Sequence, residues 1–138
     1  MLALTVRVLG LSGAEYTGTF DDVLPGDWYC TVVETGLKYG LISKDKKFRP
    51  NDLVTREEMT KMITEAYKIQ NELQRPDDYR LRYSDEADIS GWAKEYVCDA
   101  DYLGLINGVG EGRFAPKGNA TRAQSAVIIK RLLDKISE

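Results

Sequence analysis

Two arginines occupy positions at which a cation is electrostatically disfavoured, and they are the first candidates for ligand binding. Arg56 and Arg122 each follow a threonine, Thr55 or Thr121, that opens a predicted helix. The positive end of a helix dipole opposes a cation in the first turn by roughly 0.3–1 kcal/mol. Free backbone amides and a guanidinium fork at the same place suit an external carboxylate. We therefore expect the arginines to bind an acidic group, with each threonine capping the helix beside it.

A second interpretation of these arginines stays open, because arginine also pairs with acids inside a fold. The acids that the sequence offers for this purpose are Asp22, Asp52 and Asp85. An internal acid can also orient an arginine toward a ligand, so the two roles are compatible.

Trp28 and Trp92 are the aromatic candidates for carbohydrate binding. An indole presents a flat apolar face to a sugar ring and an N–H donor at its edge. Each tryptophan also falls on the apolar stripe of a predicted helix, and large aromatics on such stripes are usually buried. The pattern thus favours the core for both side chains, with sugar stacking as the alternative.

Asp22, Asp85 and Gly108 complete the set of candidate ligand-binding residues. The two aspartates precede the first helix of each repeated segment, where they can accept from sugar hydroxyls, pair with arginine or close a turn. The turn is the favoured role. Gly108, with Gly110 and Gly112, either brings backbone close to a ligand or forms a flexible turn. Because no Lys-Ser/Thr follows, this run is not a phosphate loop.

Several kinds of chemistry are excluded by composition. The 138 residues contain no histidine, which removes His-based catalytic triads and zinc sites. No aspartate cluster has the spacing of an EF-hand calcium loop. The net charge of −3 argues against nucleic-acid binding, and no apolar run approaches the roughly 20 residues of a membrane span. We expect no cofactor, no metal, no nucleic acid and no membrane insertion. Cys30 and Cys98 are interpreted as buried small apolar residues.

The candidate residues lie on a duplicated segment. The tryptophans are 64 residues apart and the arginines 66 apart, so two extra residues enter the second copy within its Gly-rich run. In order, the first copy carries Phe20, Asp22, Trp28, Gly40, Phe48, Pro50, Thr55 and Arg56. The second carries Tyr83, Asp85, Trp92, Gly104, Phe114, Pro116, Thr121 and Arg122. We predict a truncated unit with a linker over residues 1–19 and complete units over 20–75 and 76–138.

Each complete unit is predicted to form a helix, a loop and a second helix. The first helices are expected to be capped by Asp27 and Ser90 and to end at Gly40 and Gly104. The second helices begin with capping boxes at Thr55 and Thr121. Their predicted apolar stripes comprise Met59, Met62, Ile63, Ala66 and Tyr67 in the first, and Ala126, Val127, Ile129, Leu132, Leu133 and Ile136 in the second.

The N-terminal segment fits two structures. Leu2, Leu4, Val6 and Val8 alternate with less apolar residues as a strand would, whereas Leu2, Val6 and Leu9 share one helical stripe. Its place ahead of Phe20 matches the place of the second helix ahead of the next unit. We therefore predict a helix that ends an earlier, truncated unit.

These motifs resemble the S-layer homology repeat of bacterial cell-surface proteins from Phe20 to the C-terminus. The resemblance implies an all-α fold with a central bundle of long helices, pseudo-threefold when three repeats are present. It implies non-covalent, non-catalytic attachment to a secondary wall polysaccharide held in grooves between the repeats, often one bearing an acidic pyruvyl ketal. The chain departs from the family in having Lys44 where the second copy has Gly108, and in having two complete repeats rather than three.

The function expected from residues and resemblance is the anchoring of a surface protein to the cell wall. The partner is an anionic wall polysaccharide, and the location is the cell wall or S-layer, as a fragment of a longer exported protein. The alternative is a protein-interaction or self-assembly module of the same fold, in which a partner chain supplies the missing repeat. A glycan-processing enzyme is disfavoured, because the adjacent Asp21 and Asp22 are a poor match to two acids facing each other across a sugar.

Overall fold

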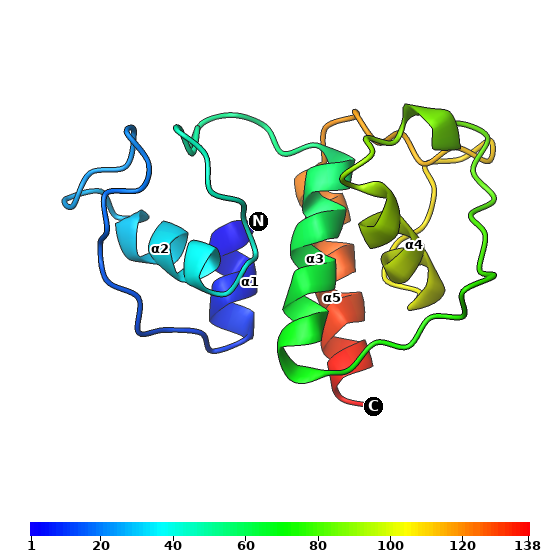
Figure 1. The fold of residues 1–138 in the computed structure, drawn as a ribbon, viewed down its shortest axis with the longest axis horizontal. Helices are drawn as coiled ribbons and strands as arrows, with labels where there is room; N and C mark the ends of the chain where they lie inside the picture. The colour runs from blue at the N-terminus through cyan, green and yellow to red at the C-terminus, as the bar shows by residue number, and fades with distance from the viewer. The chain divides into compact units, whose positions relative to one another are not determined.

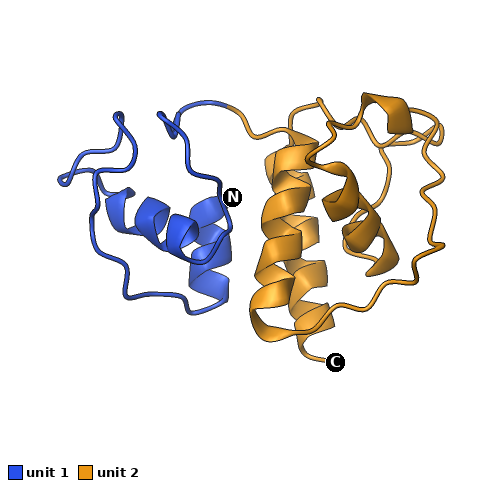
Figure 2. Cartoon of the chain, viewed as in Figure 1, with its two compact units in different colours: residues 1–52 blue, residues 53–138 orange.

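The computed structural model describes residues 1–138 and contains five α-helices, one 3-10 helix and no strand (Figure 1). Extended pairing is limited to two isolated bridges. The expected all-α class is confirmed. The chain divides into two compact units, Met1–Asp52 and Leu53–Glu138, which Figure 2 colours separately.

Unit 1 is built on two short helices that pack against each other, α1 (Leu2–Val8) and α2 (Cys30–Lys38). A Cβ at Gly36 would lie only 2.8 Å from Leu2 Cδ1, so the glycine allows α1 to approach α2 closely. Helix α1 confirms the helix predicted at the N-terminus. The buried face of α1 comprises Leu2, Thr5 and Val6.

The beginning of α2 differs from the prediction, while its end agrees. Asp27 does not cap the helix, because its carboxylate accepts from the Leu24 amide at 2.8 Å and closes a turn instead. The helix starts two residues later than predicted, at Cys30, with Tyr29 at the N-cap. Gly40 has φ 74° and follows the last turn, as expected for a left-handed C-terminal residue.

Unit 2 contains three α-helices: α3 (Arg56–Gln70), α4 (Lys94–Tyr102) and α5 (Arg122–Ile136). Helix α3 packs against both of the others, and the short helix η1 (Glu86–Asp88) precedes α4. Both predicted capping boxes are present, with Thr55 paired to Glu58 and Thr121 paired to Gln124. The two long helices α3 and α5 run side by side (Figure 1).

The beginning of α4 repeats the discrepancy seen at α2. Ser90 was expected to cap this helix, but Ala93 occupies the N-cap and the Ser90 hydroxyl donates to Glu57 on α3. Gly104, with φ 74°, ends the helical segment as predicted. Trp28 and Trp92 consequently lie in turns before the first helical residues and not on the helical stripes.

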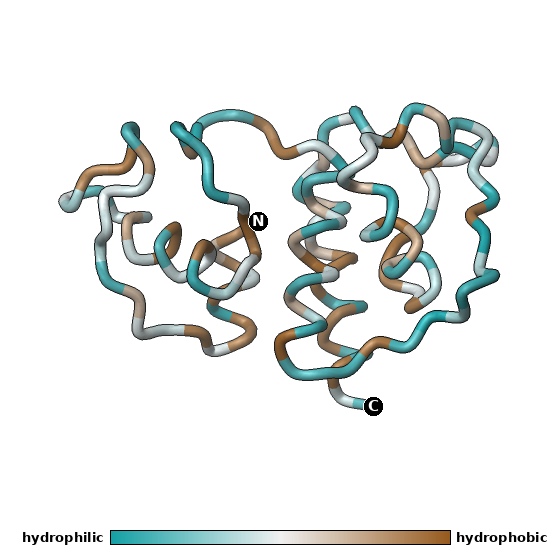
Figure 3. Tube along the Cα trace, in the orientation of Figure 1, coloured by the Kyte–Doolittle hydropathy of each residue, from teal (hydrophilic) through white to brown (hydrophobic).

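The apolar stripe predicted for α3 is confirmed, since all five of its residues are buried. The stripe predicted for α5 is only partly correct. Ile129 and Leu132 are buried together with Ile128, whereas Ala126, Val127 and Leu133 are exposed. Within unit 2, α5 packs on α3, and its buried residues form the face toward that helix. Figure 3 shows hydrophobic residues recurring along α5.

The compact units do not coincide with the sequence repeats. The first repeat, predicted over residues 20–75, contributes its loop to unit 1 and its long helix α3 to unit 2. Helix α3 thereby forms the core of unit 2 with the two helices of the second repeat. The repeat boundaries stay a prediction.

Candidate functional site

Arg56 lies inside unit 2, with only 5% of its surface exposed. Its Nε donates to the Phe114 carbonyl and its Nη2 to the Asn107 carbonyl, both at 2.8 Å. The guanidinium carbon stands 5.0 Å from the centre of the Phe114 ring. Burial lowers the pKa of Arg56, and the acidic groups of Tyr83 and Asp85 offset this only in part. No carboxylate lies within ion-pair distance, so the arginine is held by backbone carbonyls and not by the internal acid considered from the sequence.

The segment 107–118, which holds the Arg56 side chain, also contacts the amino end of α3. The backbone amide of Arg56 donates to the Gly118 carbonyl at 2.8 Å, and that of Glu57 donates to the Pro116 carbonyl at 3.1 Å. The exposed ends of helices are common anion sites because such amides are free. At α3 they are already used by the protein, together with the arginine side chain.

Glu57 is a structural residue that the sequence did not reveal. Its carboxylate is 3% exposed and accepts from the Ser90 amide at 3.0 Å, the Ser90 hydroxyl at 2.7 Å and Lys117 Nζ at 2.6 Å. Burial alone would raise the pKa of Glu57, but these hydrogen bonds outweigh it and hold the pKa below its usual value. The equivalent residue of α5 is Ala123, so comparison of the repeats gives no signal here.

Asp22 and Asp85 hold the loops of their respective repeats. The carboxylate of Asp22 accepts from the amides of Phe48 and Arg49, both at 2.7 Å. Asp85 accepts in the same way from Phe114 at 2.9 Å and Ala115 at 2.8 Å. Burial acts to raise the pKa of each aspartate, but the amide bonds prevail and lower it. Both carboxylates therefore hold a loop that lies 26 or more residues away in sequence, and do not form the local turn that was favoured. Pairing with arginine is observed for Asp85, which lies 3.9 Å from Arg113 Nε.

Gly108 serves the close packing of its own loop. A Cβ at this position would stand 2.5 Å from the Arg113 carbonyl oxygen and 3.2 Å from the Tyr83 ring. The Val109 amide donates to that same carbonyl at 2.8 Å. This tight turn accommodates the two extra residues of the second copy, whereas the shorter first loop carries Lys44 at the matching position.

Arg122 occupies the same helical position as Arg56 but differs from it in burial and in its contacts. It lies at the surface, and its guanidinium makes no hydrogen bond or ion pair with the rest of the chain. The Thr121 side chain caps the helix beside it by accepting from the Gln124 amide at 3.0 Å. Of the two candidate arginines, only Arg122 is accessible to a partner.

Both tryptophans are exposed, so the expectation of core packing is wrong. Trp28 is 79% exposed and Trp92 is 51% exposed. The reason is the late start of α2 and α4, which places each indole in a turn that lies off the buried face. The Trp28 ring meets only Tyr29 in an edge-on contact, with 5.5 Å between centroids.

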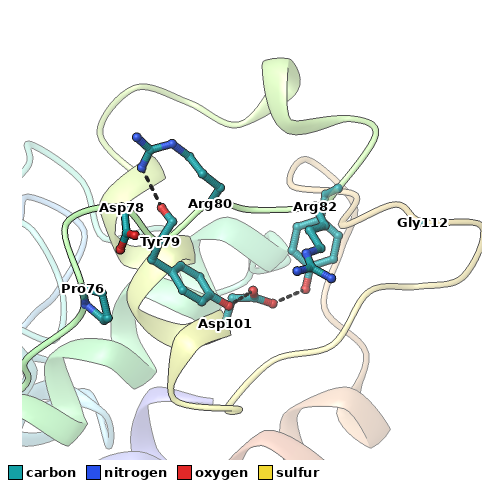
Figure 4. Close-up of a pocket in the computed structure, with 8 residues that line it drawn as sticks. Pro76, Asp78, Tyr79, Arg80, Arg82, Asp101 and Gly112 are labelled. Atoms are coloured by element: carbon teal, nitrogen blue, oxygen red, sulfur yellow. Dashed lines mark hydrogen bonds between the residues drawn. The ribbon is translucent and has the colours of Figure 1, made fainter.

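An open pocket of about 610 Å³ lies elsewhere in unit 2 and was not predicted. Tyr79 and Tyr83 point their hydroxyls at Asp101, donating to Oδ2 at 2.5 Å and to Oδ1 at 2.8 Å (Figure 4). The hydrogen bond to Asp101, with burial, raises the pKa of Tyr79 to about 12. Burial, with the same carboxylate, also raises the pKa of Tyr83. Arg80 and Arg82 also line this pocket. Apart from Tyr83, these residues belong to no repeated motif.

Two wider properties bear on the possible partners. No three side chains among Cys, Asp and Glu gather closely enough to hold a metal ion. None of the helices combines the length and apolar character that crossing a membrane requires.

Comparison with known proteins identifies the family. Residues 19–60 and 82–126, together more than half of the chain, match the S-layer homology domain. An amylopullulanase of Thermoanaerobacterium thermosulfurigenes is 43% identical over 96% of this chain, and exoglucanase XynX of Acetivibrio thermocellus is 42% identical over 96%. A surface-layer 125 kDa protein of Lysinibacillus sphaericus is 28% identical over 89%.

The chain spans only 7%, 12% and 10% of the lengths of these three relatives. The shared feature is therefore a module of larger proteins, some of them named as enzymes and others as surface-layer proteins. Its two matched segments fall on the repeats that carry Arg56 and Arg122. The chain belongs to the S-layer homology domain family, a kind of module that it shares with bacterial surface-layer proteins.

Proposed function

We propose that this chain anchors its parent protein by binding an anionic secondary wall polysaccharide, such as one with pyruvyl ketals, through side chains that folding leaves in solvent. Trp28 and Trp92 stack on sugar rings, and Arg122 pairs with the acidic substituent. The observation that carries the proposal is the exposure of both indoles at equivalent positions of the two repeats.

Packing within the fold does not account for the presence of tryptophan at these two exposed positions. Burying an indole removes roughly 150–250 Å² from water, worth about 4–6 kcal/mol at the usual coefficient. Trp28, which is 79% exposed, lacks most of that contribution. Trp92, which is 51% exposed, lacks about half of it. A flat apolar ring with one N–H donor at its edge matches the two kinds of surface that a sugar ring offers. Binding a saccharide would recover part of the missing burial.

Arg122 supplies the positive charge for the acidic substituent. The chain as a whole carries a net charge of −3, so a polyanion needs a local cation. A guanidinium can bind a carboxylate through two parallel hydrogen bonds. Arg56 has already committed its Nε and Nη2 to carbonyls of the protein and does not take this role.

The remaining candidate residues act through the frame of the site. Thr55 and Thr121 fix the starts of α3 and α5, while Asp22 and Asp85 hold the two loops. Gly108 permits the tight turn of the second loop. In this proposal they position the binding groups without touching the polysaccharide.

The test is equilibrium binding of purified wall polysaccharide, with and without its ketal acid, to the chain and its variants. Trp28→Ala and Trp92→Ala are each expected to weaken binding about tenfold, and the double variant to abolish it. Arg122→Gln should remove the difference between the ketal-bearing and ketal-free polymers.

Matched controls exist for each change. Leu24→Ala and Val109→Ala each remove an exposed apolar side chain from the same units, and Lys130→Gln removes a cation from α5. These should bind like the wild type. Full binding by the double tryptophan variant would refute the proposal, and equal affinity of the wild type for the two polymers would refute its ionic part.

A further inference from the structure

The loops of the two repeats share one conformation. We define the first loop as residues 43–52 and the second loop as residues 107–118. Arg49 in the first and Ala115 in the second have left-handed φ of 59° and 56°. The amide three residues further on, of Asp52 or Gly118, donates to the Arg49 or Ala115 carbonyl, at 3.1 Å in both cases. The loop amides held by Asp22 and Asp85 correspond as well.

Only the second loop is filled by an arginine within its own unit. Arg56 inserts there, with hydrogen bonds to the Asn107 and Phe114 carbonyls and the ring of Phe114 beneath its guanidinium. The first loop presents the equivalent Phe48 ring and carbonyl. The first loop itself contains Arg49, whose Nη2 lies 3.8 Å from an oxygen of the Asp45 carboxylate.

Arg122 is the one residue equivalent in sequence to Arg56. Each is the first helical residue after a threonine that forms a capping box. Arg122 is exposed and unpaired, while the helix that carries it also exposes Val127 (48%) and Leu133 (40%). Helix α5 therefore presents an unused cation and an uncovered apolar face on the same element.

We propose that Arg122 of one copy of this chain inserts into the first loop of a second copy, repeating the contact between Arg56 and the second loop. Two copies related by a twofold axis make this contact twice, because each offers one arginine and one loop. The apolar residues on the outer face of α5 are covered by the partner.

Charge complementarity at one position favours this pairing. In the second loop a Cβ at Gly118 would stand 3.9 Å from Arg56 Cδ, so the residue at that position faces the inserted arginine. The equivalent residue of the first loop is Asp52, which is exposed and whose carboxylate has no partner. Insertion of Arg122 would bring two unpaired opposite charges together, an ion pair that the contact of Arg56 lacks.

The association uses a side chain that the proposed function also uses. One guanidinium cannot hold the first loop and the acid of a polysaccharide at the same time, so the two partners exclude each other at Arg122. The tests below are made without polysaccharide. Their failure would leave the proposed anchoring untouched, and loss of polymer binding in the tryptophan variants does not bear on them.

The experiment is sedimentation velocity over a range of concentrations of the 138-residue chain, at low salt. The wild type should form a dimer. Arg122→Asp and Asp52→Arg should each raise the dimer dissociation constant at least tenfold, because each places like charges in both contacts. Both positions are exposed, and helicity measured by circular dichroism should not change. Lys94→Asp, an exposed position on α4 outside both proposed contacts, serves as the control and should dimerise like the wild type.

Mixing the two single variants is the decisive step. In a mixed dimer one contact keeps the native pair and the other has the pair reversed, so both contacts are complementary. An equimolar mixture of Arg122→Asp and Asp52→Arg chains should therefore form dimers that neither variant forms alone. A wild type that stays monomeric, or a mixture that stays monomeric like its components, would overturn the proposal.

Discussion

The amino ends of α3 and α5 carry the same sequence element but differ in burial and in contacts. Both begin with Thr-Arg and both complete a capping box. At α3 the arginine is 5% exposed and a loop occupies the helix end, whereas at α5 the arginine is exposed and unpaired. The difference comes from the neighbour, because the loop of the second repeat packs against the amino end of α3. The motif thus sets where a helix starts, and the next repeat sets what its arginine does.

The largest expected effect comes from removing the enclosed arginine. Arg56→Ala deletes two hydrogen bonds from a charged donor and leaves the Phe114 and Asn107 carbonyls without them. Such losses cost about 3–5 kcal/mol in buried settings. Urea unfolding of the variant should show this loss, and Arg122→Ala should unfold at the wild-type midpoint. Equal midpoints for the two variants would remove the contrast between the helix ends.

A smaller effect is expected at the neighbouring acid. Glu57→Gln loses the ion pair with Lys117 while it retains a side chain that can bond Ser90, and should destabilise the fold by about 1–3 kcal/mol. Ala123 of α5 has no such pair, so Ala123→Gln should be near neutral. The measurement is again urea unfolding at neutral pH, and a wild-type midpoint for Glu57→Gln would show that the pair contributes nothing.

The same acid predicts a pH dependence. The folded pKa of Glu57 lies below its reference value of 4.5, so its ionised form stabilises the folded state. That contribution is present above the unfolded pKa and is lost as pH falls from about 4.5 through the folded pKa. The difference in unfolding free energy between wild type and Glu57→Gln should therefore shrink in this acidic range. A difference that grows there would contradict the sign of the shift.

Substitutions at matching positions of the two loops are expected to differ in their effect on stability by a similar amount. Gly108→Ala places a Cβ within 2.5 Å of a backbone oxygen and should cost about 1–3 kcal/mol, because the loop must shift. Lys44 already carries a side chain at the matching position of the first loop, so Lys44→Ala should cost less than about 0.5 kcal/mol. Thermal unfolding of both variants is the measurement. If the Gly108→Ala variant unfolded at the same temperature as the wild type, the two loops would not differ in how tightly they are packed.

The smallest effects on stability are expected at the largest exposed side chains. Trp28→Ala and Trp92→Ala remove indoles that pack little against the fold, and Trp28, the more exposed, should change stability by less than about 0.5 kcal/mol. Thermal unfolding again provides the measurement. A large loss at Trp28 would indicate a structural role and weaken its assignment to polysaccharide binding.

Local sequence signals predicted the parts of this fold that local chemistry decides. The capping boxes at Thr55 and Thr121 and the left-handed glycines at 40 and 104 need only a few neighbouring residues, and they are where they were expected. The fold class followed from the repeat, because duplicated helix–loop–helix segments leave few other architectures.

Long-range contacts explain what the sequence could not predict. Ser90 has the chemistry of a helix cap, but Glu57 of another repeat takes its amide and hydroxyl, so α4 begins later. The tryptophans then lie outside the helices, although the sequence pattern had placed them on the apolar stripes of those helices. The carbonyls that hold Arg56 come from residues 51 and 58 positions away, and carbonyls leave no trace in the residue types. The outer face of α5 was misassigned because periodicity does not show how many partners a helix has.

The central claim is that the side chains left in solvent serve the wall polysaccharide, and the chain offers a direct probe of it. Its only two tryptophans are Trp28 and Trp92, both exposed, so acrylamide quenching of tryptophan fluorescence reports on these two sites alone. Saturating wall polysaccharide should shield the indoles and markedly lower the quenching constant. An unchanged quenching constant with the polymer bound would contradict the claim.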